Sequence, residues 1–300
     1  MKEGDFVVTA EVRPPKGTDR ELLTERIRTV KDYCDAINVT DNLRGIPLMS
    51  SLVCAHYVLQ ENAEPIMQMT SRDRNRIMVQ SDLYGAYALG VRNVLFMKGD
   101  HPSLGTHPDA QAVYDLDTVE AVALANMLEL GYDMVGDELE GTPSFFVGST
   151  FNPCDSSETQ LSRLRRKVDA GARFFQTQAI FDVPSFGNFM ERLEDFQVNT
   201  LVGIIPLRNP EIAEFMDEKV QGIDIPPELI QRLKEAGDGL EEEELIKAYE
   251  EEGLRIALEI IEDIKRVKSV SGIHLMGVGW IESVPALVKE AKLYPRPKRG

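Results

Sequence analysis

Two charged side chains and a glycine follow directly on a short apolar run and form the most informative segment of this chain. Lys98, Gly99 and Asp100 come immediately after Val94–Met97, four apolar residues in a row. Such a run is typical of a strand buried on both faces, and the glycine lets the backbone turn where the strand ends. Because parallel α/β folds bind ligands at the carboxyl ends of their strands, these charges indicate a binding or catalytic site. A solvated loop of ordinary turn residues is the alternative.

Glu11 places a carboxylate inside an otherwise apolar segment near the start of the chain, Phe6–Val12. Burial of an unpaired carboxylate is costly. Glu11 is therefore either the ion-pair partner of Arg13 or of a lysine, or a general acid that apolar surroundings keep protonated.

Two amides alternate along a later apolar segment. Gln176 and Gln178 lie within Phe174–Phe181, and strand alternation sends both side chains to the same face. Paired amides among aromatic residues suit recognition of a planar heterocycle, although amides also satisfy buried backbone groups. The preceding helical stretch carries the basic run Arg165–Lys167, which offers either a phosphate site or a solvated face.

Strand and helix signals alternate along the sequence, which is the pattern of a parallel α/β architecture. Eight segments are expected to form strands: Phe6–Val12, Ala36–Thr40, Pro65–Thr70, Asn93–Lys98, Phe145–Phe151, Phe174–Phe181, Thr200–Leu207 and Gly272–Val278. Helices are expected over Asp19–Cys34, Pro47–Glu61, Arg72–Leu89, Leu116–Leu130, Ser157–Gly171, Ser185–Phe196, Pro210–Glu218, Leu240–Lys268 and Trp280–Leu293.

Eight strands, each followed by a helix, predict a single (β/α)8 TIM barrel that forms one domain over residues 1–300. A doubly wound open sheet is the main alternative. It would normally carry a glycine-rich turn after the first strand, and Pro14–Gly17 is not such a turn.

The composition excludes several classes of partner. A net charge of −17 argues against nucleic acid. The chain lacks an apolar run long enough to span a membrane and an apolar core of a signal peptide, so a cytoplasmic protein is expected. Much of the acid lies in Glu241–Glu244 and Glu250–Glu252, which suggests a solvated helical face. Cys34, Cys54 and Cys154 lack the spacing of metal ligands, so no metal site is expected; Cys154, at a strand end, is the one candidate for a functional thiol.

Several of these motifs, in this order and spacing, carry a resemblance to a known family. They are Glu11–Pro15, Asn38–Thr40, Gly99-Asp100, Arg166–Ala172, and Thr177-Gln178 followed by Phe181-Asp182. With them the chain resembles the methylenetetrahydrofolate reductase family, in its short bacterial form made of the catalytic barrel alone, over nearly its whole length.

The resemblance implies a flavin-bearing barrel that reduces 5,10-methylenetetrahydrofolate to 5-methyltetrahydrofolate. In that role Glu11 would be the general acid that protonates N10, and Asp100 would stabilise the resulting cation. Gln178 and Met216 match substrate-binding positions, although Met216 replaces an aromatic residue.

The resemblance also implies a set of flavin contacts, with FAD as the expected cofactor and FMN as the alternative. The matching positions are Thr40, Gln68, Lys98, Gly99, Asp100, Val113, Tyr114 and Lys167. Lys98 stands where arginine is common in the family, and a lysine ammonium cannot make the bidentate contact of a guanidinium. Gln68 replaces a histidine, and Gln160 replaces an acidic residue.

These departures leave the electron donor open between NAD(P)H and an iron–sulfur electron-transfer subunit, and we expect an oligomer or a hetero-complex. Two alternative functions remain. One is a catalytic subunit that is active only with an iron–sulfur partner, because three unpatterned cysteines cannot hold a four-cysteine cluster. The other is a pterin-dependent methyl-transfer barrel without flavin.

Overall fold

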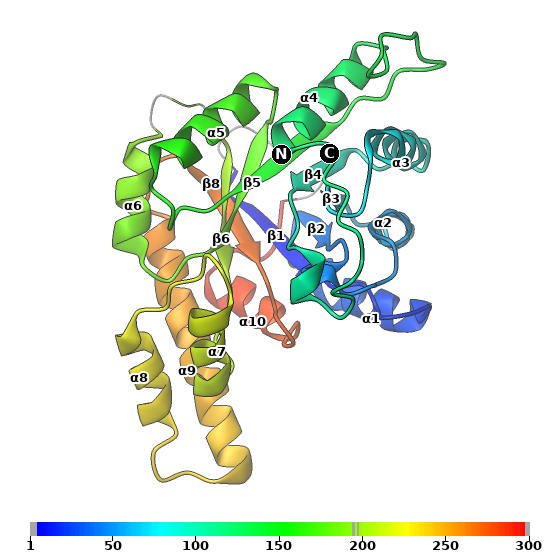
Figure 1. Ribbon diagram of the computed structural model, residues 1–300. Coiled ribbons are helices and arrows are strands. Elements are labelled where there is room, and N and C mark those ends of the chain that lie inside the picture. The colour runs from blue at the N-terminus through cyan, green and yellow to red at the C-terminus, as the bar shows by residue number, and fades with distance from the viewer. Residues whose placement is uncertain (1–4, 194–195, 197, 298–300) are drawn as a thin grey trace.

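The computed structural model of this chain describes residues 5–193, 196 and 198–297, and its centre is a closed barrel of eight parallel strands (Figure 1). The strands pair in chain order, and β8 closes the barrel against β1. Their bounds are β1 Val7–Val12, β2 Ala36–Val39, β3 Pro65–Thr70, β4 Asn93–Met97, β5 Phe146–Phe151, β6 Phe174–Ala179, β7 Thr200–Ile204 and β8 Val270–Leu275. The predicted (β/α)8 architecture is therefore confirmed.

Helices surround the barrel and connect its strands (Figure 1). Their bounds are α1 Arg20–Val30, α2 Ser51–Gln60, α3 Arg76–Ala88, α4 Thr118–Glu129, α5 Glu158–Asp169, α6 Val183–Glu191, α7 Pro210–Lys219, α8 Pro227–Ala236, α9 Glu242–Ile264 and α10 Ser283–Glu290. Each predicted helix is present, and most have shorter ends, although α6 begins two residues earlier and α7 ends one residue later than predicted. Part of the predicted end of α6, residues 194–195, lies outside the described residues. None of the described helices is long and apolar enough to cross a membrane.

Three strands end two or three residues earlier than predicted. They end at Ala179, Ile204 and Leu275 instead of Phe181, Leu207 and Val278. After β8, for example, the backbone N–H of Trp280 donates to the carbonyl of Gly277 and closes a turn. After β6 and β7 the apolar composition continues because Ile180, Phe181, Ile205 and Leu207 are buried in the hydrophobic core, so hydrophobicity alone overestimates strand length.

Helix α8, Pro227–Ala236, has no counterpart among the predicted elements. It packs on α9 through the buried Leu233, and both helices extend below the barrel in the view of Figure 1. Glu241–Glu244 and Glu251 are exposed, as the predicted solvated face requires, and the contact with α8 corrects that prediction at Glu252 alone. Glu252 is buried because its carboxylate pairs with Arg232 of α8 and with Arg255.

The barrel interior changes from apolar to polar along the strands. An apolar layer fills the half nearer the amino ends of the strands and contains Ala36, Ile66, Leu95, Phe174 and Leu201. A Cβ at Gly148 would lie 2.3 Å from the Phe174 ring, so glycine there makes room for the aromatic side chain. Two residues further along their strands, Thr9, Asn38, Gln176 and His274 form a buried polar layer. The polar layer marks the carboxyl end as the place for a site.

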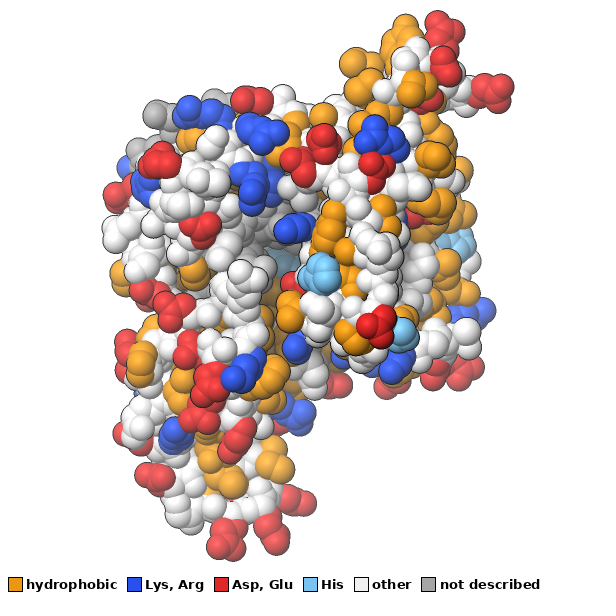
Figure 2. All heavy atoms as spheres, in the orientation of Figure 1, with side chains coloured by type: hydrophobic (Ala, Val, Ile, Leu, Met, Phe, Trp, Pro, Cys, Tyr) orange, Lys and Arg blue, Asp and Glu red, His pale blue; other side chains and the backbone are white. Residues whose placement is uncertain are grey.

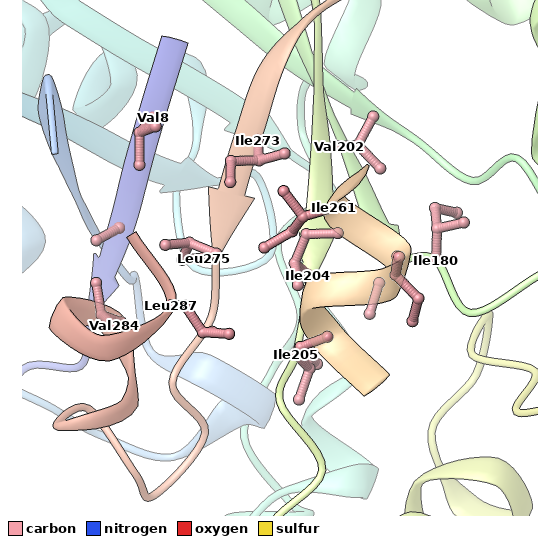
Figure 3. Packing of buried hydrophobic residues seen from close by; sticks show 14 of the residues in the cluster. Val8, Ile180, Val202, Ile204, Ile205, Ile261, Ile273, Leu275, Val284 and Leu287 are labelled. Carbon is pink, nitrogen blue, oxygen red and sulfur yellow. The ribbon is translucent and has the colours of Figure 1, made fainter. Parts of the chain in front are cut away.

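The outer faces of the strands pack against helices. Figure 3 shows Val8, Ile273 and Leu275 among the buried residues beside Ile261 of α9 and Leu287 of α10. This continuous core holds the strand ends, and thus the mouth of the barrel, in fixed positions.

Candidate active site

Glu11 of β1 lies at the carboxyl end of the barrel and faces a histidine. Its Oε2 is 3.8 Å from Nε2 of His274, and the two side chains are 17% and 3% exposed. On the other side of the ring, Nδ1 is 2.9 Å from the hydroxyl oxygen of Thr9, which itself donates to the carbonyl of Ile273. Because the Thr9 hydroxyl already donates, we assign a proton to Nδ1 as the donor to Thr9, and Nε2 faces the carboxyl group. Among the described residues Glu11 pairs with this histidine and not with Arg13.

Gln176 and Gln178, which the sequence suggests as paired recognition amides, have different surroundings in the structure. The side chains of Gln176 and Asn38 exchange two hydrogen bonds, of 2.7 Å and 3.1 Å, inside the barrel. Gln176 also donates to the hydroxyl of Thr9 at 3.5 Å. Its amide is therefore occupied by other buried side chains, whereas Gln178, two residues further along β6, is exposed at the mouth. Of the two, Gln178 is available to a ligand.

The loop after β4 brings several predicted residues together. The hydroxyl of Tyr114 donates to the carbonyl of Gly99 at 3.0 Å, and the Lys98 ammonium lies 5.4 Å from the centre of the Tyr114 ring. Arg72, which is almost fully buried, donates to the backbone carbonyl of Asp100 at 3.2 Å. Burial raises the pKa of Tyr114; the positive charge of Arg72 opposes this shift and the charge of Asp100 adds to it. Tyr114 is thus a neutral phenol that fixes the loop while the Asp100 side chain stays exposed.

Thr40 and Asp41 directly follow β2 and have different roles. Asp41 accepts hydrogen bonds from the backbone N–H and the hydroxyl of Thr70, at 2.8 Å and 3.0 Å, and pairs with Arg74. These contacts fix the end of β2 against the end of β3. The hydroxyl of Thr40 is buried and has no hydrogen-bond partner among the described residues. A buried polar atom without a partner is uncommon, and it marks a position where a ligand can supply one.

Lys167 of α5 is a buried cation beside β5. Its ammonium donates to the carbonyl of Thr150 at 2.6 Å, and its side chain is almost fully buried. Burial lowers the pKa of Lys167 to about 8; the charge of Arg163 lowers it further, and Asp117 opposes the shift. The described residues thus leave this ammonium short of negative charge, as expected of a group that binds an anion.

Three other predicted positions have distinct surroundings. Gln68 is buried on β3 inside the barrel. Val113, in the loop after β4, is 41% exposed, and its backbone N–H donates to the carbonyl of Arg72, which follows β3. Met216 of α7 is 4% exposed and belongs to the hydrophobic core.

The aromatic residue that α7 presents to its surroundings is Phe215, one residue before Met216. Its ring is 48% exposed and lies 5.8 Å from the guanidinium of Arg44, in the loop after β2. The helical period explains the difference, because it turns Ala213 and Met216 inward and Phe215 outward.

A separate cavity of about 460 Å³ opens between the loops after β5 and β6, and Cys154, Phe181, Asp182 and Asp224 are among its lining residues. Burial raises the pKa of the Cys154 thiol, and the two carboxylates raise it further. The thiol is therefore protonated at neutral pH and is a poor nucleophile. In the described part of the chain no group of three or more His, Cys, Asp or Glu side chains is placed to hold a metal ion.

Solved structures with similar backbones establish the class of fold. A Clostridium thermocellum protein that binds two copies of 5-methyl-5,6,7,8-tetrahydrofolic acid superimposes with a TM-score of 0.66 at 17% identity and covers 96% of this chain and 95% of its own. DmoA from Hyphomicrobium sulfonivorans gives a TM-score of 0.53 at 11% identity, over 99% of this chain and 90% of its own. At these identities the two structures show the barrel fold alone.

The sequence identifies the family. A family profile described as methylenetetrahydrofolate reductase matches residues 1–292. The chain belongs to this family. It is 25% identical to methylenetetrahydrofolate reductase (NADH) 1 of Arabidopsis thaliana over 91% of its length, and 26% identical to 5,10-methylenetetrahydrofolate reductase of Escherichia coli over 62%. These alignments cover 46% and 55% of the relatives, so the chain spans about half of their length. The Salmonella typhimurium enzyme is 25% identical over 91% of this chain and 86% of its own.

Proposed function

We propose that this protein reduces 5,10-methylenetetrahydrofolate to 5-methyltetrahydrofolate with a bound flavin, and that Glu11 is the general acid. Family membership supports the reaction class. The observation that carries the residue assignment is the position of Glu11, a partly buried carboxyl group at the barrel mouth within 3.8 Å of His274.

The residues around the mouth fit a flavin. The unpartnered hydroxyl of Thr40 offers a hydrogen bond to a ring, and the buried ammonium of Lys167 suits a phosphate oxygen. Lys98 and Tyr114 add a cation and an aromatic surface on the loop after β4. We take FAD as the flavin and assign Val113 and Tyr114 to its adenosine side, with Gly99 and Gln68 as further contacts. When bound, the flavin supplies the hydride that the methylene carbon accepts.

Glu11 supplies the proton that this reduction needs. The methylene carbon bridges N5 and N10, and protonation of N10 releases that nitrogen and leaves an electrophilic iminium at N5. Nε2 of His274 faces the carboxyl group of Glu11 at 3.8 Å, and Thr9 holds the imidazole ring in place through Nδ1. Hydride addition to the methylene carbon then completes the methyl group and neutralises the cation.

Asp100, Gln178 and Phe215 complete the proposed substrate site. The exposed carboxylate of Asp100 stabilises the iminium charge through space, because its loop is already fixed by Arg72. The Gln178 amide offers one donor group and one acceptor to the pterin edge. The exposed ring of Phe215 takes the packing role that the sequence first suggested for Met216.

A half-reaction assay separates this proposal from its alternatives. The flavin released from purified protein is identified by chromatography, and enzyme reduced with dithionite is mixed anaerobically with 5,10-methylenetetrahydrofolate in a stopped-flow spectrometer. Reoxidation of the flavin with formation of 5-methyltetrahydrofolate supports the proposal, whatever the natural electron donor is. A protein that binds no flavin would refute it and favour methyl transfer. Reduction trials with NADH, NADPH and a low-potential iron–sulfur protein then identify the donor.

A further inference from the structure

Three adjacent helices on one side of the barrel carry almost no charge, although the chain has a net charge of −17. Helix α2 has no charged residue, α3 has Arg76 and Asp82, and α4 has Glu120 and Glu129. Half of the residues of α5 are charged, by contrast. We call the outward surface of α2, α3 and α4 the neutral face. Since solvated helices normally carry charge on their outer side, this face departs from the rest of the surface.

The neutral face also exposes large apolar side chains. Val53 of α2 is 44% exposed, Ile77 and Tyr84 of α3 are 69% and 39% exposed, and Met127 of α4 is 36% exposed, followed by Leu130 at 75%. The three helices pack side by side, and Figure 2 shows hydrophobic side chains gathered along the edge that α3 and α4 form.

The segment after α4 borders this surface but carries Asp133, Asp137, Glu138 and Glu140, so it is not part of the neutral face. It projects from the barrel in Figure 1 and folds back on α3, where the side-chain carbonyl of Gln80 accepts a 2.9 Å hydrogen bond from the backbone N–H of Met134. Next to this bond, Val135 is 81% exposed. An apolar surface that continues across several elements is typical of a protein interface.

Charge indicates what covers this surface. Two copies of a strongly acidic chain repel one another unless the surfaces that meet are poor in carboxylates, and the neutral face meets that condition. A basic partner would instead find its complement on the acidic helix α9. An anionic membrane needs lysine and arginine, and the helices of the neutral face offer Arg76 alone, which is paired with Asp115.

The dimensions of the neutral face suit a dimer. With 13 residues, α3 is about 20 Å long, and three helices about 10 Å apart cover roughly 600 Å² in projection. This area lies at the lower end of the roughly 600–1,000 Å² per partner of standard interfaces.

We propose that the neutral face is the interface between two copies of this chain, related by a two-fold axis. In such an interface every residue is used twice, so one charge introduced into the chain places two charges in the contact. The mouth of the barrel lies at the strand ends and remains open in this arrangement.

Sedimentation velocity of the full, flavin-loaded protein tests the proposal with a matched pair of variants. Ile77→Asp introduces a carboxylate on the neutral face, and Ile246→Asp makes the same change on α9, where the isoleucine is 55% exposed. The wild type and Ile246→Asp should sediment as dimers at micromolar concentration, while Ile77→Asp should raise the dissociation constant at least a hundredfold. A monomeric wild type, or equal association of all three proteins, would overturn the proposal.

Hydrogen exchange gives a second measurement that needs no variant. Raising the wild-type concentration across the dissociation constant should slow exchange in peptides from residues 76–90 and 118–135, and leave peptides of α9 unchanged. Slowing confined to another surface would show a dimer of different geometry and would refute the assignment.

Discussion

Replacement of Lys167 by methionine should stabilise the flavin-free protein and weaken flavin binding at the same time. The lowering of the Lys167 pKa from 10.5 to about 8, chiefly by burial, corresponds to about 3 kcal/mol of unfavourable free energy for the charged folded state. Methionine removes this cost but also removes the hydrogen bond to the Thr150 carbonyl, which is worth about 1 kcal/mol. We therefore expect a net gain of about 2 kcal/mol at pH 7, or about 4 °C in melting temperature.

The same lysine predicts a pH dependence with a definite sign. Because the pKa of Lys167 is lower in the folded than in the unfolded chain, the folded state holds fewer protons between about pH 8 and pH 10.5. The contribution of this group is therefore fully unfavourable below pH 8 and is relieved as the pH rises through that window. The stability advantage of Lys167→Met over wild type should shrink between pH 8 and pH 10.5.

Thermal unfolding of the flavin-free proteins measures this effect, and fluorescence titration gives the flavin dissociation constants. Arg166→Met is the matched control, since it removes an exposed cation from the adjacent position of the same helix. Lys167→Met should bind flavin at least tenfold more weakly than this control. If Lys167→Met is less stable than wild type and binds flavin equally well, the ammonium is a structural donor to Thr150, and the reasoning is wrong.

Three other substitutions test the remaining parts of the site. Thr40→Val removes a buried hydroxyl that lacks a protein partner, so it should weaken flavin binding several-fold in a fluorescence titration and leave the melting temperature unchanged or higher. Asp41→Ala removes one of the two carboxylates that pair with Arg74 and leaves the Thr70 N–H without its acceptor, so it should cost about 3 kcal/mol in denaturant unfolding. An unchanged midpoint would contradict the role of this contact. Gln178→Leu should raise the KM for the folate substrate about tenfold with little change in flavin reduction, and an unaltered KM would remove it from the substrate site.

The sequence predicts the fold because the fold depends on repeated local signals. Alternating strand and helix periods reveal the eight strands, and polar residues at strand ends point to Glu11 and Asp100. What escapes prediction depends on contacts between distant segments. His274 lies in the middle of the last predicted strand, and only closure of the barrel brings it to Glu11. Arg72 stands just after the third strand, and its role appears once the loop after β4 folds over it.

Side-chain direction is the other property that sequence patterns leave open. Strand alternation predicts the same role for Gln176 and Gln178. Gln176, however, lies deeper in the barrel, where its amide is hydrogen-bonded to Asn38. Phe215 and Met216 are neighbours in a helix, and the register of that helix on the core decides which one is exposed. A titratable residue inside an otherwise apolar strand, which drew attention to Glu11, is the signal that would also have suggested His274.

The most direct test of the account is a single-turnover experiment on Glu11→Gln, which keeps the size and hydrogen-bonding capacity of the side chain but cannot donate a carboxylic proton. The variant should bind flavin and be reduced by dithionite like the wild type. Its reduced flavin should transfer hydride to 5,10-methylenetetrahydrofolate at least a hundredfold more slowly. Glu25→Gln, an exposed change on α1, should react at the wild-type rate. Formation of 5-methyltetrahydrofolate by Glu11→Gln at the wild-type rate would contradict the assignment of Glu11 as the general acid.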